Sequence, residues 1–301
     1  MKCKLVVLSE LFILFCLIGQ GVQFKLIVST LGKITEVNLQ TRAVTHLLTN
    51  LESEIDSMDY DYKNGYIYFP RYSKNDILRF RYPSNNTYQT ENVTMANNPI
   101  GIAIDPLYNH VYWIERYTGK IYQCNMDGSN QVLILQDYTM FALTLDVINR
   151  WIYYSIIDTS HNVIRRARIN GTEKQTFTDV HTQTVSGLSI DFNEGHIYWM
   201  EYITGDLMSS DVKGTALSQV FMTNTANTNR GIHAYHNIIY CSNGNQILKV
   251  TVSSTVTANI TYTDKEQIYG VFIYSETTFN EQKMQITNTE CVGEIDETET
   301  R

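Results

Sequence analysis

The apolar side chains of this chain fall into short runs that alternate with polar turns. Within residues 101–135, four runs of four to six residues are separated by stretches that carry Asn, Asp, Gly and Thr. The runs are rich in Ile, Val and Tyr, which favour pleated, half-buried surfaces. The pattern predicts four short antiparallel strands rather than amphipathic helices.

This four-strand pattern repeats along the chain. First strands end in an Asp that is followed seven residues later by a Tyr. The motif pairs are Asp61 and Tyr68, Asp105 and Tyr112, Asp146 and Tyr153, and Asp191 and Tyr198. With Tyr240, these tyrosines are 44, 41, 45 and 42 residues apart. A repeat of this length predicts the blades of a β-propeller, because a single four-stranded sheet cannot bury both of its faces.

The two ends of the repeat region complement each other. Residues 24–50 contain three strands of a blade, at 26–29, 34–38 and 43–48, but no first strand. A first strand is due at 267–274, where QIYGVFIY follows the last complete unit. We therefore predict an all-β, six-bladed β-propeller of four-stranded antiparallel blades, closed by pairing of the C-terminal strand with the N-terminal strands. Closure is expected to remove sheet edges that would invite aggregation.

Hydrophobicity and charge divide the chain into three segments. Residues 1–21 have a basic start, an apolar run and a small-x-small end, which indicates a signal peptide. The apolar run, about 14 residues, is shorter than the roughly 20 that a membrane-spanning helix needs. The propeller is predicted over residues 22–274, and residues 275–301 are expected to form an acidic, flexible tail.

Cysteines, sequons and charge bear on the compartment and the partner. Removal of the leader would leave three cysteines, Cys124, Cys241 and Cys291. Three thiols cannot form a disulfide framework, so at least one is free or bonded to another chain, and Cys291 is the candidate for such a link. Four glycosylation sequons agree with secretion, and their acceptors are Asn85, Asn92, Asn170 and Asn259. The net charge is −8 and the Lys and Arg residues are scattered, which argues against nucleic acid as a partner.

Two segments carry a resemblance to a known family. Residues 111–115 (VYWIE) and 197–201 (IYWME) each follow a first strand that ends in Ile-Asp. With the spacing from Asp to Tyr and the period, they resemble the YWTD, or class B, repeats of the low-density lipoprotein receptor family and nidogen, over about residues 24–274. The Thr-Asp half of the motif is nowhere intact, so the chain resembles a divergent member.

The resemblance implies that the motif residues are structural. Tyr112, Trp113, Tyr198 and Trp199 are expected in the core between blades. The motif aspartates Asp61, Asp105, Asp146 and Asp191 are expected to accept hydrogen bonds from turn amides.

Sequence motifs of the common enzyme classes do not occur in the chain. The rival hypothesis is a calcium-dependent lactonase or esterase, because some six-bladed propellers hold a metal in the central channel on oxygen ligands. The candidate ligands are Glu54, Asp56, Asn98, Asn229 and Glu266. His233 and His236 lie on opposite faces of a strand, which is poor for one metal. No general base is recognisable, so we expect neither a cofactor nor catalysis.

Binding is the better-supported function. One face of the ring, the loop face, is expected to consist of the loops between second and third strands and those that lead into first strands. Its candidate residues are Arg71, Tyr72, Glu115, Arg116, Tyr117, Asp158, Glu201 and Tyr202. Aromatic rings would supply contact area, and exposed carboxylates would select amide or basic groups. We expect a secreted protein that binds an extracellular protein, glycan or matrix component; the alternative is that these loops are only solvated turns.

Overall fold

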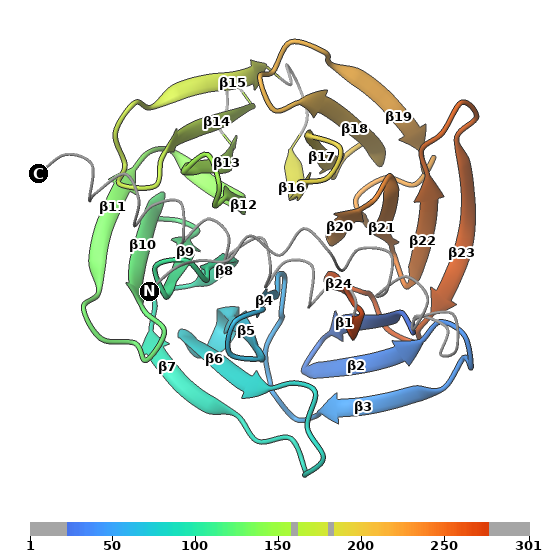
Figure 1. Ribbon diagram of the computed structural model, residues 1–301, viewed down its shortest axis with the longest axis horizontal. Coiled ribbons are helices and arrows are strands. Elements are labelled where there is room, and N and C mark those ends of the chain that lie inside the picture. Colours follow the sequence, from blue (N-terminus) through green and yellow to red (C-terminus); the bar gives the residue numbers. More distant parts are fainter. Residues whose placement is uncertain (1–22, 158–161, 180–183, 277–301) are drawn as a thin grey trace, which may run out of the picture.

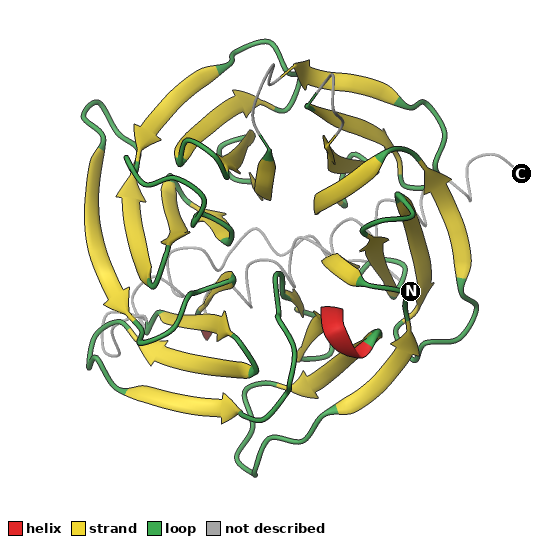
Figure 2. Ribbon diagram, turned by 180° about the vertical axis from the view of Figure 1, so that it is seen from behind, coloured by secondary structure: helices red, strands yellow, loops and turns green. Residues whose placement is uncertain are grey.

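A computed structural model describes residues 23–157, 162–179 and 184–276. Six four-stranded antiparallel sheets stand around a central axis like the blades of a propeller (Figure 1). The all-β, six-bladed architecture predicted from the repeat is therefore confirmed. The 3₁₀ turn Tyr72–Lys74, in the described part of the chain, is drawn as a helix in Figure 2. In the described part of the chain, no helix has the length and apolar character to cross a bilayer.

Blades 2 to 6 follow the chain from the inner to the outer strand, whereas blade 1 takes its inner strand from the C-terminal end. Blade 1 contains β24 (Gly270–Tyr274), β1 (Lys25–Thr30), β2 (Lys33–Asn38) and β3 (Val44–Leu48). Blade 2 contains β4 (Asp59–Asp61), β5 (Tyr66–Arg71), β6 (Asp76–Arg81) and β7 (Glu91–Met95), and blade 3 contains β8 (Pro99–Asp105), β9 (His110–Glu115), β10 (Lys120–Asn125) and β11 (Val132–Gln136). Blade 4 contains β12 (Thr139–Asp146), β13 (Trp151–Ile157), β14 (Val163–Arg168) and β15 (Gln175–Asp179). Blade 5 contains β16 (Val185–Asp191), β17 (His196–Glu201), β18 (Asp206–Asp211) and β19 (Ser218–Met222), and blade 6 contains β20 (Ile232–Tyr235), β21 (Ile238–Asn243), β22 (Gln246–Thr251) and β23 (Thr257–Thr263).

Blade 1 joins the two ends of the propeller. β24 pairs with β1 in antiparallel register from Lys25 opposite Tyr274 to Ser29 opposite Gly270. The Ser29 hydroxyl accepts a hydrogen bond from the Gly270 amide at 2.8 Å and donates one to the Ile55 carbonyl of blade 2 at 2.7 Å. The predicted closure is confirmed. It leaves the outer strands β3, β7, β11, β15, β19 and β23 each with one unpaired edge at the circumference, so the expectation that closure removes sheet edges is wrong for the outside of the ring.

Large aromatic side chains fill the spaces between blades. Trp113 is fully buried and packs with Tyr68 and Ile77 of blade 2. Its neighbour Tyr112 points the other way along the alternating strand and packs with residues of blade 4. Trp199 and Tyr198 repeat this arrangement, toward blades 4 and 6. The motif aromatics are therefore core residues between blades.

The motif aspartates end the first strands and hold the turns to the second strands. Asp61, for example, accepts hydrogen bonds from the amides of Lys63 and Asn64. Two of these carboxylates also connect blades: Asp105 forms an ion pair with Arg150 of blade 4 at 2.7 Å, and Asp191 accepts a bond from the Asn237 amide of blade 6 at 2.8 Å. These buried carboxylates therefore have a structural role, because they hold turns and connect neighbouring blades.

Candidate binding face and axial channel

The loop face carries a group of tyrosines and arginines around the axis. We call Tyr72, Arg116, Tyr117, Tyr202, Arg230 and Tyr269 the Tyr-Arg cluster. The 3₁₀ turn Tyr72–Lys74 lies on this face (Figure 2). The opposite, lower face carries the turns between first and second strands.

One half of the Tyr-Arg cluster lies over blades 2 and 3. The hydroxyl of Tyr72 donates to that of Tyr117 at 2.8 Å, and their rings meet edge to face with centroids 6.4 Å apart. The Arg116 guanidinium lies over the Tyr117 ring at 5.5 Å and over the Phe141 ring at 4.9 Å. Tyr117 is 64% exposed. The result is a pre-arranged aromatic and cationic surface that is open to a partner.

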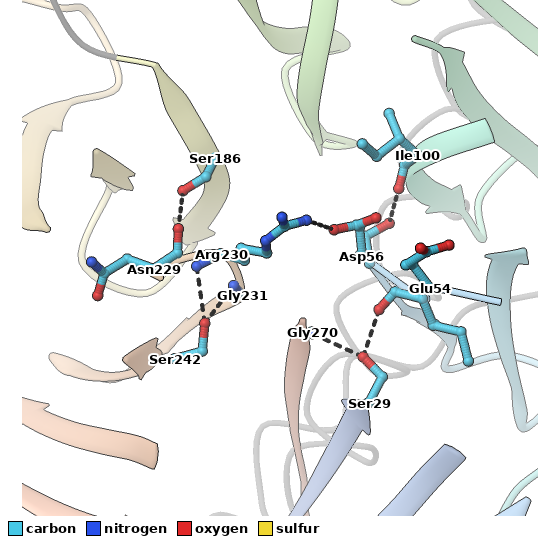
Figure 3. A network of polar contacts seen from close by, with 12 residues as sticks. Ser29, Glu54, Asp56, Ile100, Ser186, Asn229, Arg230, Gly231, Ser242 and Gly270 are labelled. Carbon is cyan, nitrogen blue, oxygen red and sulfur yellow. Dashed lines mark hydrogen bonds and ion pairs between the residues drawn. The ribbon is translucent and has the colours of Figure 1, made fainter. Parts of the chain in front are cut away.

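The other half of the Tyr-Arg cluster is centred on Arg230. Arg230 and Asp56 point toward each other across the mouth of the central channel (Figure 3) and form an ion pair at 2.7 Å. The guanidinium also lies over the rings of Tyr269 at 4.9 Å and Tyr202 at 5.5 Å. Burial raises the pKa of the Asp56 carboxyl, while Arg230 and Arg116 act in the opposite direction. Asp56 thus lies between the two halves of the cluster.

Two of the predicted loop-face acids do not face solvent. Glu115 and Glu201 are each 7% exposed. Glu115 accepts hydrogen bonds from the Asn97 amide at 2.9 Å and the Thr118 hydroxyl at 3.2 Å, and Glu201 accepts one from Thr204 at 3.3 Å. Burial raises the pKa of Glu201. The prediction of exposed acids beside each tyrosine is therefore wrong, because these carboxylates close their own loops.

The remaining predicted loop-face residues have mixed positions. Tyr72, Arg116, Tyr117 and Tyr202 belong to the Tyr-Arg cluster. Arg71 forms an ion pair with Asp76 and donates to the Leu51 carbonyl at 3.2 Å, so it holds its own loop in place. Asp158 lies outside the described residues.

The candidate metal ligands make contacts with other protein groups. Glu54 accepts a hydrogen bond from the Ser73 hydroxyl at 2.6 Å, and Glu266 forms an ion pair with Lys33 at 3.3 Å. The Asn229 amide donates to the Thr225 carbonyl at 2.6 Å, the Asn98 backbone carbonyl accepts from the Arg116 amide at 3.3 Å, and Asp56 is neutralised by Arg230. Among the described residues, no group of three His, Cys, Asp or Glu side chains could hold a metal ion. Glu54, Asp56 and Asn229 do lie in one network of polar contacts (Figure 3), but the side chain of each is engaged by another protein group.

A channel of about 190 Å³ runs along the axis below the Asp56–Arg230 ion pair. Aliphatic residues of the first strands line much of its wall, including Ile102, Leu143, Leu188 and Ile232. The titratable groups that line it include Asp59 of β4 and His233 of β20. Burial raises the pKa of Asp59 to about 7 and lowers that of His233 to about 4. Sequence reasoning had not assigned Asp59 to any site.

A set of serines that the sequence analysis missed connects the inner strands. Ser29, Ser155 and Ser242 occupy the third position of the motif in blades 1, 4 and 6, and their hydroxyls accept from the amides of Gly270, Ala142 and Gly231. A second set crosses between blades, since Ser57 accepts from the Ile102 amide and Ser189 from the Ala234 amide, each at 2.9 Å. The recurrence of Ser at the third position was visible in the aligned repeats.

The sequon asparagines and the thiols lie away from the Tyr-Arg cluster. Asn85, Asn92, Asn170 and Asn259 are all exposed, on outer strands or on turns between third and fourth strands. Cys124 and Cys241 are free and buried, and burial raises the pKa of each thiol to about 12. Both are therefore unreactive core residues. Cys291 lies outside the described residues.

Sequence comparison finds distant relatives. No family model matches the chain. The Protein cueball of Drosophila willistoni is 22% identical over 237 residues, which are 73% of this chain and 36% of the relative. The Protein cueball of Drosophila ananassae is 21% identical over 178 residues, which are 54% of this chain and 28% of the relative. The chain thus aligns with about a third of the length of these curated relatives.

Structural comparison supports the fold. A chain from the crystal structure of a nidogen/laminin complex superposes with a TM-score of 0.72 and 14% identity, over 83% of this chain and 98% of that chain. A streptogramin B lyase structure superposes with a TM-score of 0.61 and 14% identity, over 85% of this chain and 93% of that chain. At this identity the likeness establishes the β-propeller fold and no more.

Proposed function

We propose that this protein is a secreted, non-enzymatic β-propeller of the divergent YWTD type, which binds an extracellular protein or matrix component through the Tyr-Arg cluster. The observation that carries the proposal is the composition of that cluster. Tyr and Arg are enriched among the residues that dominate protein interfaces, where they combine large contact area with polar ends. Here four tyrosines and two arginines surround one mouth of the channel, and contacts between them hold the rings in place.

The positions of the glycosylation sequons agree with the loop face as the binding surface. A glycan at any of the four asparagines would cover the outer wall or the lower rim of the ring, because none of the four is on the loop face. The Tyr-Arg cluster would then remain accessible. Likeness to a propeller from a nidogen/laminin complex agrees with a protein partner. A leader over residues 1–21 and an acidic tail over 275–301 belong to this proposal; residues 1–22 and 277–301 lie outside the described residues.

Affinity capture from extracellular material of the source organism tests the proposal. The unaltered chain, a Tyr117→Ala/Tyr202→Ala variant and a Tyr108→Ala variant are immobilised in parallel. Tyr108 is 60% exposed on the lower face and serves as the matched control. We expect one dominant protein to bind the unaltered chain and the control but not the double variant. Equal capture by all three would place the recognition surface elsewhere.

The alternative is a calcium-dependent lactonase or esterase. Likeness to the streptogramin B lyase structure shows that an enzyme can have this fold, without assigning a reaction to this chain. In its favour, Asp56 does lie at the channel mouth; against it, the Arg230 guanidinium already neutralises that carboxylate. Stoichiometric calcium together with turnover of a lactone or aryl ester would overturn the non-enzymatic proposal.

A further inference from the structure

The channel contains a carboxylate without a counterion. Asp59 accepts hydrogen bonds from the Ile104 amide at 2.7 Å and the Tyr60 amide at 2.8 Å. No described Lys, Arg or His forms an ion pair with it, and the one charged neighbour that acts on its pKa is another acid, Asp61. An ionised carboxylate in such surroundings is costly unless a cation accompanies it.

Holding the strand edge does not require a charge at this position. The amides of Ile102 and Ala234 project from neighbouring first strands in the same way, and the neutral hydroxyls of Ser57 and Ser189 accept their hydrogen bonds. Asp59 performs this role for Ile104 with a carboxylate, at a desolvation cost that serine avoids. The negative charge of Asp59 is therefore not explained by the hydrogen bond to the Ile104 amide alone.

Aromatic rings surround the same end of the channel. Tyr60 and Tyr62 meet edge to face, with ring centroids 4.8 Å apart. Tyr62 lies within electrostatic reach of both Asp59 and Tyr235, and both tyrosines 62 and 235 line the channel. A carboxylate beside the faces and edges of phenol rings is a favourable environment for an organic cation.

Size and access restrict the ligand. An apolar cavity of about 150 Å³ holds one benzene molecule, so 190 Å³ suits a single ring with a short side chain. The Asp56–Arg230 ion pair spans the upper mouth (Figure 3). At the lower end the channel is lined by Leu107, Ile148 and Phe192, of which Ile148 and Phe192 are 48% and 38% exposed. A ligand would therefore enter from the lower face.

We propose that the axial channel binds a small ammonium ion that carries one aromatic ring, with Asp59 as its counterion and Tyr62 and Tyr235 beside it. This site is separate from the Tyr-Arg cluster and does not depend on the proposed protein binding. A metal ion is a poorer occupant, because no described second or third acid accompanies Asp59 in a metal-binding group.

Isothermal titration of the full chain with three probes tests the proposal. 2-Phenylethylamine, 2-phenylethanol and 3-phenylpropionate share a ring and a short side chain but are cationic, neutral and anionic. At mildly alkaline pH, where Asp59 is ionised, we expect the amine to bind at least about tenfold more tightly than the alcohol. The anion should not bind. Equal binding of amine and alcohol, or no binding of the amine, would overturn the proposal.

Matched variants assign the preference to one carboxylate. Asp59→Asn should abolish the preference for the amine over the alcohol, whereas Asp127→Asn, at an exposed turn, should retain it. An unchanged preference in Asp59→Asn would show that the cation binds elsewhere. If Asp59→Asn fails to fold, the three-probe comparison on the unaltered chain still decides. Saturating amine should not alter capture of a protein by the loop face.

Discussion

Tyr153 and Arg166 lie directly opposite each other on neighbouring strands of blade 4, and both donate to the carbonyl oxygen of Val212 in blade 5, at 3.2 and 3.0 Å. Blade 2 repeats the arrangement, in which Tyr68 and Arg79 share the Met126 carbonyl of blade 3, at 3.4 and 2.8 Å. In both cases the strand pair of one blade clamps a turn of the next.

Because the two donors share an acceptor, their substitutions should not be additive. Tyr153→Phe or Arg166→Met alone should each reduce the free energy of unfolding by about 1 to 2 kcal/mol, since one donor still satisfies the carbonyl. The double variant should lose more than the sum, because the Val212 carbonyl is then left unsatisfied. Urea denaturation of the four proteins measures the coupling.

A residue pair in blade 3 is the control, because its two substitutions should deviate from additivity in the opposite direction. Tyr112 donates directly to Gln123 at 2.9 Å, so either single change breaks that one bond and the double variant should lose less than the sum. Strict additivity at Tyr153 and Arg166 would contradict the shared-acceptor interpretation.

Trp199→Ala should destabilise the propeller severely. The side chain is fully buried between blades 4 and 5, and its removal leaves a cavity that costs about 3 to 5 kcal/mol. Trp151→Ala is the matched control, because Trp151 is only partly buried and stacks with Arg166 and Arg168 at 4.6 and 3.9 Å. Chemical denaturation should show a smaller loss for Trp151→Ala. Equal losses would mean that burial between blades is not what makes Trp199 important.

Removal of β24 should abolish cooperative unfolding. A chain that ends at Asp264 leaves the β1 edge unpaired at the centre of the ring and exposes Phe272's neighbours Tyr60 and Tyr62. We expect it to aggregate or to melt over a broad range in calorimetry. A chain that ends at Glu276 retains β24 and should melt as the full chain does. Closure would lose its importance if the two truncated chains behaved alike.

Asp59 should make stability fall as pH rises toward neutrality. Its pKa is raised from 3.8 to about 7 by burial, so the folded protein retains a proton that the unfolded chain has already released. Between these values the contribution of Asp59 to the free energy of unfolding therefore decreases with pH, by about 4 kcal/mol in total, and it levels off above pH 7. His233, whose pKa burial lowers to about 4, contributes in the opposite direction, so the effect of Asp59 is read as the difference between the unaltered chain and Asp59→Asn. Asp59→Asn should remove this decrease, and Asp127→Asn should not. Parallel pH profiles for Asp59→Asn and the unaltered chain would show that Asp59 is ionised without penalty.

On the loop face, tyrosines and acids should have separable effects. Tyr202→Ala should weaken binding of a captured partner by at least about 2 kcal/mol and leave the melting temperature nearly unchanged. Glu115→Ala should instead lower the free energy of unfolding by about 1 kcal/mol, because the Asn97 amide and the Thr118 hydroxyl lose their acceptor. Surface plasmon resonance and thermal melting of both variants provide the test. The reverse pattern would identify the acids as contact residues.

The repeat made the fold predictable, whereas the site depended on contacts that no local pattern records. The spacing from Asp61 to Tyr68 and its copies predicted six blades and the C-terminal closing strand. Glu115 and Glu201 end the second strands of blades 3 and 5, where loops begin. The pattern therefore predicted that their side chains are exposed to solvent. A Thr three residues after each Glu was the available signal for a closed turn, since Thr118 and Thr204 are the donors.

Long-range pairs lay beyond the reach of sequence reasoning. Asp56 and Arg230 are 174 residues apart and come from blades 2 and 6, so only the closed ring brings them to the same mouth. Asp59 belongs to the same first strand as the motif residue Asp61. The sequence does not show which residues surround it in the folded channel, so its position in the repeat did not mark it as a site residue. Its isolation from cations is a property of the channel wall, which all six blades build together.

The pairing of Lys25 with Tyr274 also sets an order of events during synthesis. β1 is among the first strands of the propeller to emerge from the ribosome, and its inner partner β24 is the last. At about 5 to 20 residues per second, the intervening chain takes roughly 12 to 50 seconds to be made. Throughout that interval the inner edge of β1 has no strand to pair with, so the nascent protein depends on whatever shields that edge until its final blade is complete.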